Sequence, residues 1–325
     1  MQPILRRVAF AAFLFSVPGA VSATPPASAA THLTVGTAHA TADAELPATV
    51  GVELGFFKQH GLDIKLADLG GDSRVIQAMT AGSIDIGVGG ATGMALIAKG
   101  APVVAVCEDS ATQPYFAIAV PWDSPLHSLK ELKGKKIGIT RENSTTDWLA
   151  RQLAHSQGWP PDAITRVAIG GDPAASLSAL RQHLVDADMG GTMDFATMED
   201  QKVARILAPV SDYLGKVASG VLYATNHLAQ TDPGAIRAYI AAWLETTSYM
   251  TTHKDETVKI EAIITHYAPR IVAKAYDIDT GMFTPDCRFD AESVEMLKQS
   301  FVDLKLLPTA PDMSKLYTME FLPKR

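Results

Sequence analysis

Short apolar runs alternate along the chain with stretches in which apolar residues recur at helical spacing. The runs TVGT at residues 34–37 and IGIT at residues 137–140 have the short, β-branched character of buried strands. Residues 235–250 instead repeat their apolar positions with a period of 3.6, which predicts a helix that buries Ile236, Tyr239, Ile240, Trp243 and Leu244. Strands that alternate with helices predict an α/β protein built on doubly wound, mostly parallel sheets.

The alternating pattern occurs twice. ADLGGDSRVIQAMTAGSIDIGVGGATGMA (67–95) resembles RVAIGGDPAASLSALRQHLVDADMGGTMDFA (166–196), with Gly-Gly-Asp before each helix and Gly-Gly after each following strand. Two related units predict two lobes. Ligands bind beyond the carboxyl ends of parallel strands, so we expect a ligand cleft where the two loop-rich edges meet. We assign residues 30–116 and 221–325 to lobe one and residues 117–220 to lobe two.

The N-terminus has the pattern of an export signal. The charged segment MQPILRR precedes the apolar segment VAFAAFLFSV, and small residues follow up to Ala29, with an earlier cleavage option after Ala23. We assign residues 1–29 to a signal peptide and expect a periplasmic protein. No cysteine stands near the cleavage site, so a lipid anchor is not expected. No later stretch approaches the roughly 18 apolar residues of a membrane span.

Charge and residue usage exclude several partners. The formal charge is −7 and basic residues form no block, so nucleic acid is not an expected partner. The nine histidines never stand at the spacing of metal ligands, so neither a metal site nor a cofactor is predicted. An oxidising compartment permits a disulfide between Cys107 and Cys287. Cys107 ends the apolar run PVVAVC, however, so we favour a buried thiol and leave the disulfide open.

Six motifs together resemble one known family. They are GVELGFFKQHGLDIKL, SIDIGVGG, KGAPVVAV, DSPLHSLKELKGKKIGIT, NSTTDWLAR and NHLAQTDPGAIRAYI. In this order they resemble the nitrate/sulfonate/taurine (NMT1/THI5-like) substrate-binding proteins of ABC importers. The resemblance implies a type II two-lobed periplasmic binding protein that closes on a small-molecule ligand and delivers it to a permease at the inner membrane. It implies a receptor without enzymatic activity, which we expect to be monomeric.

Two departures from the family pattern matter. Gly190 to Asp194 (GGTMD) stands where the family usually has a Pro-containing acidic loop, which leaves the role of this loop open. The related yeast-type pyrimidine synthases carry a Cys-rich iron motif, and this chain has only two cysteines. That enzymatic branch is therefore set aside.

The segment TRENSTTDWLAR, from Thr140 to Arg151, allows two interpretations that are compatible with each other. Ser144 can cap a helix, with Asp147 three residues later reaching back to complete a capping box. The same helix N-terminus presents free N–H donors to any ligand in front of it.

The candidate ligand contacts are the loops that follow the strands of both units. Glycines there allow close approach of a ligand to the backbone, and hydroxyls supply hydrogen bonds. The candidates are Thr37, His39, Gly71, Asp72, Ser73, Gly90, Thr92, Asn143, Ser144, Thr145, Thr146, Asp172, Gly191 and Thr192.

Charges near the predicted helix bear on the ligand. Glu142 stands beside Arg141, and Asp147 offsets the positive helix N-terminus, so a multiply charged anion is not expected. A singly charged or zwitterionic ligand of the sulfonate, taurine or carboxylate type is favoured. A pyrimidine or thiamine-precursor heterocycle is the alternative. A periplasmic enzyme on the same fold would have to use residues such as His39, Asp72 and Asp172, whose spacing carries no signature. A stand-alone ligand sensor would have the same pocket.

Overall fold

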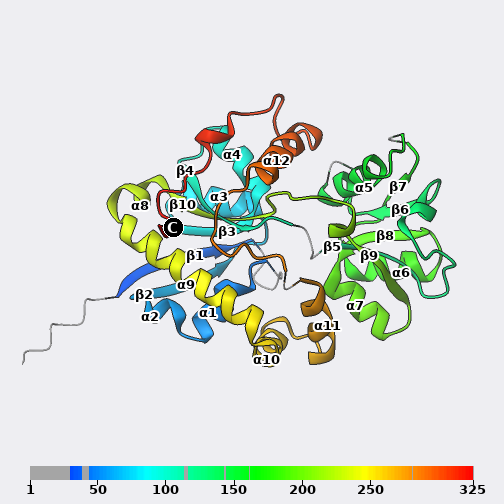
Figure 1. Cartoon of the computed structure of the whole chain (residues 1–325), viewed down its shortest axis with the longest axis horizontal. Helices are drawn as coiled ribbons and strands as arrows, with labels where there is room; N and C mark the ends of the chain where they lie inside the picture. Colours follow the sequence, from blue (N-terminus) through cyan, green and yellow to red (C-terminus); the bar gives the residue numbers. More distant parts are fainter. Residues whose placement is uncertain are drawn as a thin grey trace, which may run out of the picture.

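The protein contains two five-stranded sheets that lie side by side (Figure 1). The computed structural model describes residues 30–38, 44–112, 116–142, 144–160, 162–279 and 281–324. The predicted signal peptide, residues 1–29, lies outside the described residues. Among the described residues, no helix is both long and apolar enough to span a membrane.

The two sheets share one topology. The first sheet has the order β2-β1-β3-β10-β4 and the second has the order β7-β6-β8-β5-β9. The strands of the first are β1 Thr31–Thr37, β2 Leu62–Asp68, β3 Ile86–Gly90, β4 Val103–Ser110 and β10 Gly220–Thr225. Those of the second are β5 Phe116–Pro121, β6 Lys136–Ile139, β7 Thr165–Ala168, β8 Ala187–Gly191 and β9 Ala204–Pro209.

Pairing within the sheets confirms the predicted fold class. β1 is parallel to β2 and β3, just as β6 is parallel to β7 and β8. The antiparallel strand of each sheet, β10 or β5, is the one that has just crossed from the other sheet. The helices α3 Asp72–Thr80 and α6 Pro173–Arg181 occupy equivalent places in the two units, as the internal repeat predicts.

Helices cover both sheets (Figure 1). Besides α3 and α6, these are α1 Leu46–Glu53, α2 Phe56–Gln59, α4 Met94–Ala98, α5 Thr145–Ser156 and α7 Thr192–Asp200. The remaining α-helices are α8 Asn226–Thr231, α9 Pro233–Thr252, α10 Lys254–Thr265, α11 Pro269–Asp279 and α12 Ala291–Asp303. Short 3-10 turns are η1 Ala91–Gly93, η2 Leu129–Leu132, η3 Val210–Asp212 and η4 Met313–Lys315.

The chain crosses between the sheets after β4 and again before β10, and the two crossing segments pair with each other. The amide of Ser219 donates to the carbonyl of Ser110 at 2.9 Å, and the amide of Val217 donates to that of Ala111 at 3.0 Å. We call the lobe that contains the first sheet lobe one and the other lobe two. The boundaries at residues 116/117 and 220/221 stay a prediction; by the sheet that contains it, Phe116 of β5 belongs to lobe two and Gly220 of β10 to lobe one.

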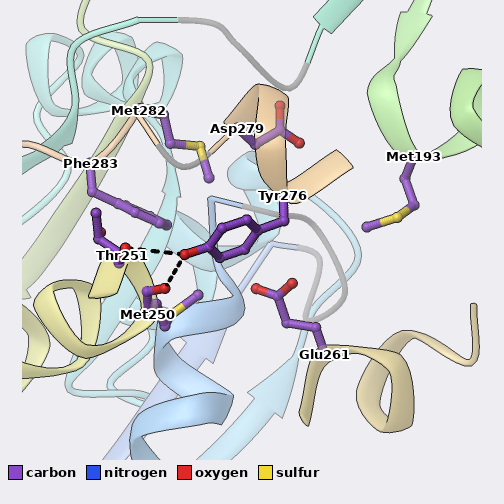
Figure 2. A pocket seen from close by; sticks show the side chains of 8 residues that line it. All are labelled: Met193, Met250, Thr251, Glu261, Tyr276, Asp279, Met282 and Phe283. Carbon is purple, nitrogen blue, oxygen red and sulfur yellow. Dashed lines mark hydrogen bonds between the residues drawn. The ribbon is translucent and has the colours of Figure 1, made fainter. Parts of the chain in front are cut away.

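Helix α11, from the C-terminal part of the chain, packs against α7 of lobe two. Asp279 at its end accepts a hydrogen bond from Thr192 at 2.9 Å, and Arg270 makes a two-pronged ion pair with Asp200. On the other side, the hydroxyl of Tyr276 donates to the carbonyl of Met250 at 2.7 Å, at the end of α9 (Figure 2). α11 is therefore held by lobe two as well as by α9.

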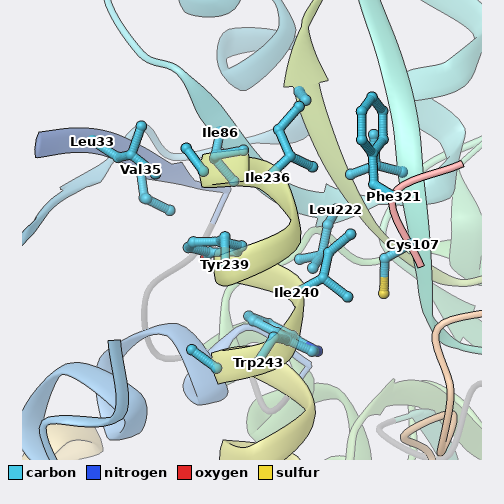
Figure 3. Packing of buried hydrophobic residues seen from close by; sticks show 14 of the residues in the cluster. Leu33, Val35, Ile86, Cys107, Leu222, Ile236, Tyr239, Ile240, Trp243 and Phe321 are labelled. Atoms are coloured by element: carbon cyan, nitrogen blue, oxygen red, sulfur yellow. The ribbon is translucent and has the colours of Figure 1, made fainter. Parts of the chain in front are cut away.

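The core of lobe one lies between its sheet and α9 (Figure 3). The predicted helix is confirmed, since α9 buries Ile236, Tyr239, Ile240 and Trp243 almost completely, while Leu244 is partly buried. Tyr239 also stacks on Phe57 of α2, with ring centroids 4.9 Å apart. Buried apolar side chains of this size each contribute about 1.5–3 kcal/mol to folding.

The prediction that Cys107 is a buried free thiol was wrong. Cys107 of β4 and Cys287 form a disulfide, with their Cα atoms 4.6 Å apart. The chain returns alongside β4 after α11, and the amide of Glu108 donates to the carbonyl of Cys287 at 3.0 Å. Cys107 is also fully buried, so its apolar setting was predicted correctly. The pairing depends on a return path separated by 180 residues, for which the local sequence holds no signal.

Candidate functional site

A cavity of about 270 Å³ lies between the lobes. Lobe one contributes Ala44, Glu45, Asp72 and the stretch Gly89 to Thr92, and lobe two contributes Phe116, Thr145 and Trp148. The crossing segment supplies Val217 to Ser219, β10 supplies Gly220, and α12 with its C-cap residue supplies Leu297, Ser300 and Leu304. Both lobes and the segment that joins them thus form one cavity, which is close to the lower end of the size range of small-molecule sites.

Asp72 organises the wall that lobe one contributes. Its carboxylate accepts a hydrogen bond from the amide of Gly90 at 2.6 Å and a longer one from the Thr92 hydroxyl at 3.4 Å. A Cβ atom at Gly90 would lie 2.7 Å from this carboxylate and would displace it from the Gly90 amide, so glycine at this position preserves the contact. The repeated Gly-Gly motif therefore brings the first residue of α3 against the end of β3.

The start of α5 forms the wall from lobe two. Ser144 is the N-cap, and its Oγ accepts from the amide of Asp147 at 3.3 Å and donates to the carbonyl of Arg141 at 2.7 Å. Thr146 is buried, and its Oγ1 accepts from the amide of Thr140 at 2.9 Å. The capping interpretation thus holds for Ser144, whereas Thr146 is bonded to Thr140 just after β6 and Thr145 lines the cavity.

The carboxylate of Asp147 is paired with arginine. It meets Arg166 of β7 at 2.7 Å and Arg151, one turn further along α5. The sequence predicted that Asp147 reaches back to the N-cap and offsets the helix N-terminus. With two guanidinium groups beside it, its charge is balanced, so it opposes an anion at the N-terminus of α5 much less than predicted.

Several candidate residues lie away from this cavity. Gly71 and Ser73 line a neighbouring surface pocket together with Asp72 and Thr92. Thr37 is buried at the end of β1, and its hydroxyl has no hydrogen-bond partner among the described residues. His39 and Asn143 lie outside the described residues.

The lobe-two equivalents of Asp72 and Thr92 have structural roles. Asp172 is exposed and caps α6 by accepting from the amide of Ala174 at 2.9 Å. Thr192 follows Gly191 at the N-terminus of α7, is fully buried and donates to Asp279. Because α11 packs on α7, it covers Thr192 in lobe two, whereas the equivalent residue of lobe one, Thr92, lines the cavity. Residues 190–194, predicted as a loop, instead end β8 and begin α7; Thr192 among them contacts α11, and none of them lines the cavity.

A second space lies at this junction, between Met193, Met250, Tyr276, Asp279 and other residues (Figure 2). It holds only about 20 Å³, which is room for about one water molecule. The cavity between the lobes, to which both lobes contribute, is therefore preferred to this space as the candidate ligand site.

Sequence reasoning missed several residues of the cavity. Glu45 precedes α1, and Phe116 begins β5. Glu45 lies at the far end of the β1–α1 connection, beyond the loop residues that were selected, and Phe116 does not follow a repeated strand. Trp148 lies one turn into α5, and the sequence alone indicates only that it belongs to the apolar face of that helix. Leu297 and Ser300 come from α12, whose position depends on tertiary packing alone.

The ionisable groups at and behind the cavity are carboxyl groups. Among the described residues that line it, Glu45 and Asp72 are charged, and none is Lys or Arg. Behind the crossing segment, burial raises the pKa of the Glu108 carboxyl to about 7. Burial, and then the neighbouring Glu108 charge, raises the pKa of Asp109 well above its usual value.

Among the residues that the structure describes, no candidate metal centre accompanies the cavity. Within the described ranges, no group of three or more His, Cys, Asp or Glu side chains is arranged to hold a metal ion.

Two lobes of this shared topology, joined by paired crossing segments around a small cavity, define the fold of periplasmic binding proteins. The chain belongs to the NMT1/THI5-like family, whose model matches residues 45–257. It is 27% identical over 216 residues to a provisionally named binding protein of Brucella abortus (strain 2308). That alignment covers 66% of this chain and 65% of the relative, so the chain spans about two thirds of the relative's length.

Solved structures share the fold at low sequence identity. The periplasmic aliphatic sulphonate binding protein SsuA of Escherichia coli matches with a TM-score of 0.73 and 18% identity, over 90% of this chain and 92% of that one. The alkanesulfonate-binding protein SsuA of Xanthomonas axonopodis pv. citri, bound to MOPS, matches with a TM-score of 0.69 and 19% identity, over 90% and 99%. The desulfurization enzyme DSZB also matches, with a TM-score of 0.64 and 15% identity, over 90% and 97%. The fold therefore occurs in binding proteins and in an enzyme.

Proposed function

We propose that the protein is a monomeric periplasmic solute receptor. It binds a small organic zwitterion or anion of the sulfonate, taurine or carboxylate type and delivers it to the permease of an ABC importer at the inner membrane. The observation that carries this proposal is the cavity between the lobes, to which both lobes and the crossing segment contribute. Such a site is completed by lobe closure, so binding is coupled to a change that a permease can recognise.

The wall from lobe two suits the anionic end of the ligand. Thr145 lines the cavity at the first turn of α5, where a helix N-terminus favours negative charge. Asp147 nearby is neutralised by Arg151 and Arg166. Thr92 and Ser300 add hydroxyls within the same cavity, and hydroxyls both donate and accept hydrogen bonds.

A flat heterocycle of the pyrimidine or thiamine-precursor type is the second candidate ligand. The specific observation in its favour is the pair of aromatic residues, Phe116 and Trp148, that lobe two contributes to the cavity. Aromatic side chains stack on planar rings, whereas a small aliphatic sulfonate makes little use of them.

An enzymatic function is less well supported. The proposed acid and base candidates do not meet, because Asp72 lines the cavity and is hydrogen-bonded to Gly90, while Asp172 is exposed as the cap of α6. A receptor requires only binding and closure, which the observed cavity can provide.

A melting-temperature screen of the mature protein, residues 30–325, tests the proposal. The screen would contain sulfonates, amino sulfonates, carboxylates, nitrate and aminopyrimidines. A ligand at 100 times its Kd stabilises the folded state by about 2.7 kcal/mol, so a true ligand raises the melting temperature measurably. Uptake of the hit into cells with and without the gene then tests delivery. Chemical conversion of a hit by the purified protein would contradict the receptor assignment.

A further inference from the structure

We infer that Trp148 limits the length of the ligand, because its indole closes the cavity between the lobes against a larger outer groove. This inference rests on the proposed function and identifies a residue that determines specificity within it. A ligand that fits the cavity ends at the indole, whereas a longer ligand with the same head group has to displace the indole.

Two spaces adjoin each other along α5 and α12. One is the cavity of about 270 Å³ between the lobes, and the other is an outer groove of about 790 Å³. On α12, Leu297 and Ser300 line the cavity, whereas Met296 and Gln299 line the groove. Among the described residues, Trp148 alone lines both spaces. Its indole therefore stands between the cavity and the groove.

The indole is held in this position by contacts from both lobes. Trp148 is 3% exposed and packs in a buried cluster with Leu153 of α5 and with Leu304 at the end of α12. Its indole N–H donates to the carboxylate of Asp303 at 3.4 Å, and its backbone amide donates to the carbonyl of Ser144 at 3.0 Å. Displacement of the indole would break the first of these bonds and disturb the packing, so the side chain acts as a wall of the cavity.

The groove beyond the indole suits an apolar extension of the ligand. Trp159 and Met296 line it, and both side chains are partly buried. Burial of a methylene against such side chains is favourable. A long apolar tail is therefore excluded by the indole itself and not by the chemistry of the space behind it.

Another space that adjoins the cavity does not offer the same route. The surface pocket at the start of α3 shares Asp72 and Thr92 with the cavity, and the Thr92 hydroxyl donates to Asp72. Arg74 and Lys99 also line that pocket. Polar and charged groups of this kind do not favour an apolar tail. The passage toward the groove is therefore the one whose opening should lengthen the ligand.

Homologous series of probes test the inference by calorimetry. The probes are the linear alkanesulfonates from methanesulfonate to octanesulfonate and the linear carboxylates from acetate to octanoate. In the wild type, each added methylene should raise the affinity by about fourfold until the chain reaches the indole. The next longer members should bind at least tenfold more weakly. If neither series binds, derivatives of the hit from the melting-temperature screen that carry linear alkyl groups, from methyl to hexyl, take their place.

Substitution of Trp148 should remove the length limit. Trp148→Leu should move the optimum to longer chains and bind the longest member of the series at least tenfold more tightly than the wild type does. Trp159→Leu is the matched control, because it makes the same change at a tryptophan that lines the groove but not the cavity, and it should keep the wild-type optimum. Circular dichroism checks that the variants fold. If Trp148→Leu does not fold, the milder variant Trp148→Phe should move the optimum in the same direction.

The outcomes separate the inference from the proposed function. Three results would overturn the inference and leave the receptor intact: an unchanged optimum in the folded Trp148 variant, the same shift in Trp159→Leu, or a wild-type affinity that keeps rising to the longest chain. If no solute in the melting-temperature screen binds, the proposed function fails and the inference fails with it.

Discussion

The indole N–H of Trp148 donates to the carboxylate of Asp303 across 3.4 Å, and this contact joins α5 of lobe two to the end of α12. Trp148 lines the cavity between the lobes on one side and an outer groove on the other. Of these two spaces, Asp303 lines only the groove. The pair therefore separates the cavity from solvent, and it ties the helix α12, which packs on the core of lobe one through Leu297 and Phe301, to lobe two.

Loss of the hydrogen bond between Trp148 and Asp303 should weaken the closure of the two lobes on the ligand. We expect Asp303→Ala to reduce ligand affinity by about 2- to 5-fold, since a long hydrogen bond of this kind contributes about 0.5–1 kcal/mol. The emission of Trp148 should also shift to longer wavelength, because its N–H gains access to water. The control is Glu295→Ala on the same helix, which removes only an exposed pair with Lys298. Identical affinity and emission in both variants would show that the contact does not hold the lobes together.

The two threonines at the start of α5 should respond differently to loss of their hydroxyls. Thr145→Val should lower ligand affinity by about 2- to 12-fold, as expected for one hydrogen bond worth about 0.5–1.5 kcal/mol, with little change in the melting temperature of the empty protein. Thr146→Val should instead destabilise the protein by about 1–3 kcal/mol, because the partly buried amide of Thr140 loses its acceptor. Both changes keep a β-branched residue in the helix, so helix propensity hardly changes. Calorimetry and thermal melts distinguish the two effects, and equal behaviour of the two variants would refute the division of roles.

The internal repeat made the fold predictable, because its matched glycines and aspartates fix the same local structure twice. Gly-Gly-Asp precedes α3 and α6, and Gly-Gly ends β3 and β8, which gave two sheets and a cleft between them. The N-cap at Ser144 was predictable for the same reason. Local sequence decides such features, because they depend on residues within a few positions of each other.

The candidate site was only partly predictable, because the two units differ in what packs on them. Thr92 and Thr192 occupy equivalent places in the repeat, but Thr92 lines the cavity and Thr192 is bonded to Asp279 of α11. Nothing in the repeat indicates that a helix nearly 80 residues later covers one unit. Glu45 and Ser300 enter the cavity for the same kind of reason, through packing between distant segments.

Stability should fall as the pH rises from about 4.5 to about 7. The folded-state pKa of Glu108 is raised to about 7, chiefly by burial and slightly by Asp290, while the Ser293 hydroxyl, the Asp290 amide and Lys216 act against the increase. The folded protein thus holds this proton more tightly than the unfolded chain does. The tighter binding of this proton contributes about 3 kcal/mol to the free energy of unfolding. The contribution is fully present below the pKa of Glu108 in the unfolded chain, and it is lost as the pH rises through the pKa in the folded protein.

Urea unfolding at several pH values checks this dependence. Glu108→Gln keeps an acceptor for the Ser293 hydroxyl, which donates to Glu108 at 2.5 Å, and it removes the titration. We expect the slope between pH 4.5 and pH 7 to flatten in this variant and to remain in the exposed control Glu295→Gln. A wild-type protein whose stability rises over this range, with the same slope in Glu108→Gln, would contradict the assignment.

Reduction of the disulfide between Cys107 and Cys287 should destabilise the protein strongly. The bridge closes a loop between residues 180 positions apart, so it restricts the unfolded chain, and native disulfides of this kind contribute about 2–5 kcal/mol. We expect dithiothreitol to lower the melting temperature of the wild type to nearly that of the double variant Cys107→Ala/Cys287→Ala. The double variant itself should not respond to the reductant, which controls for other effects of dithiothreitol. Ligand affinity should change little, because neither cysteine lines the cavity between the lobes. Free thiols detected in the oxidised, folded wild type, together with a melting temperature that ignores the reductant, would show that the bridge does not form in solution.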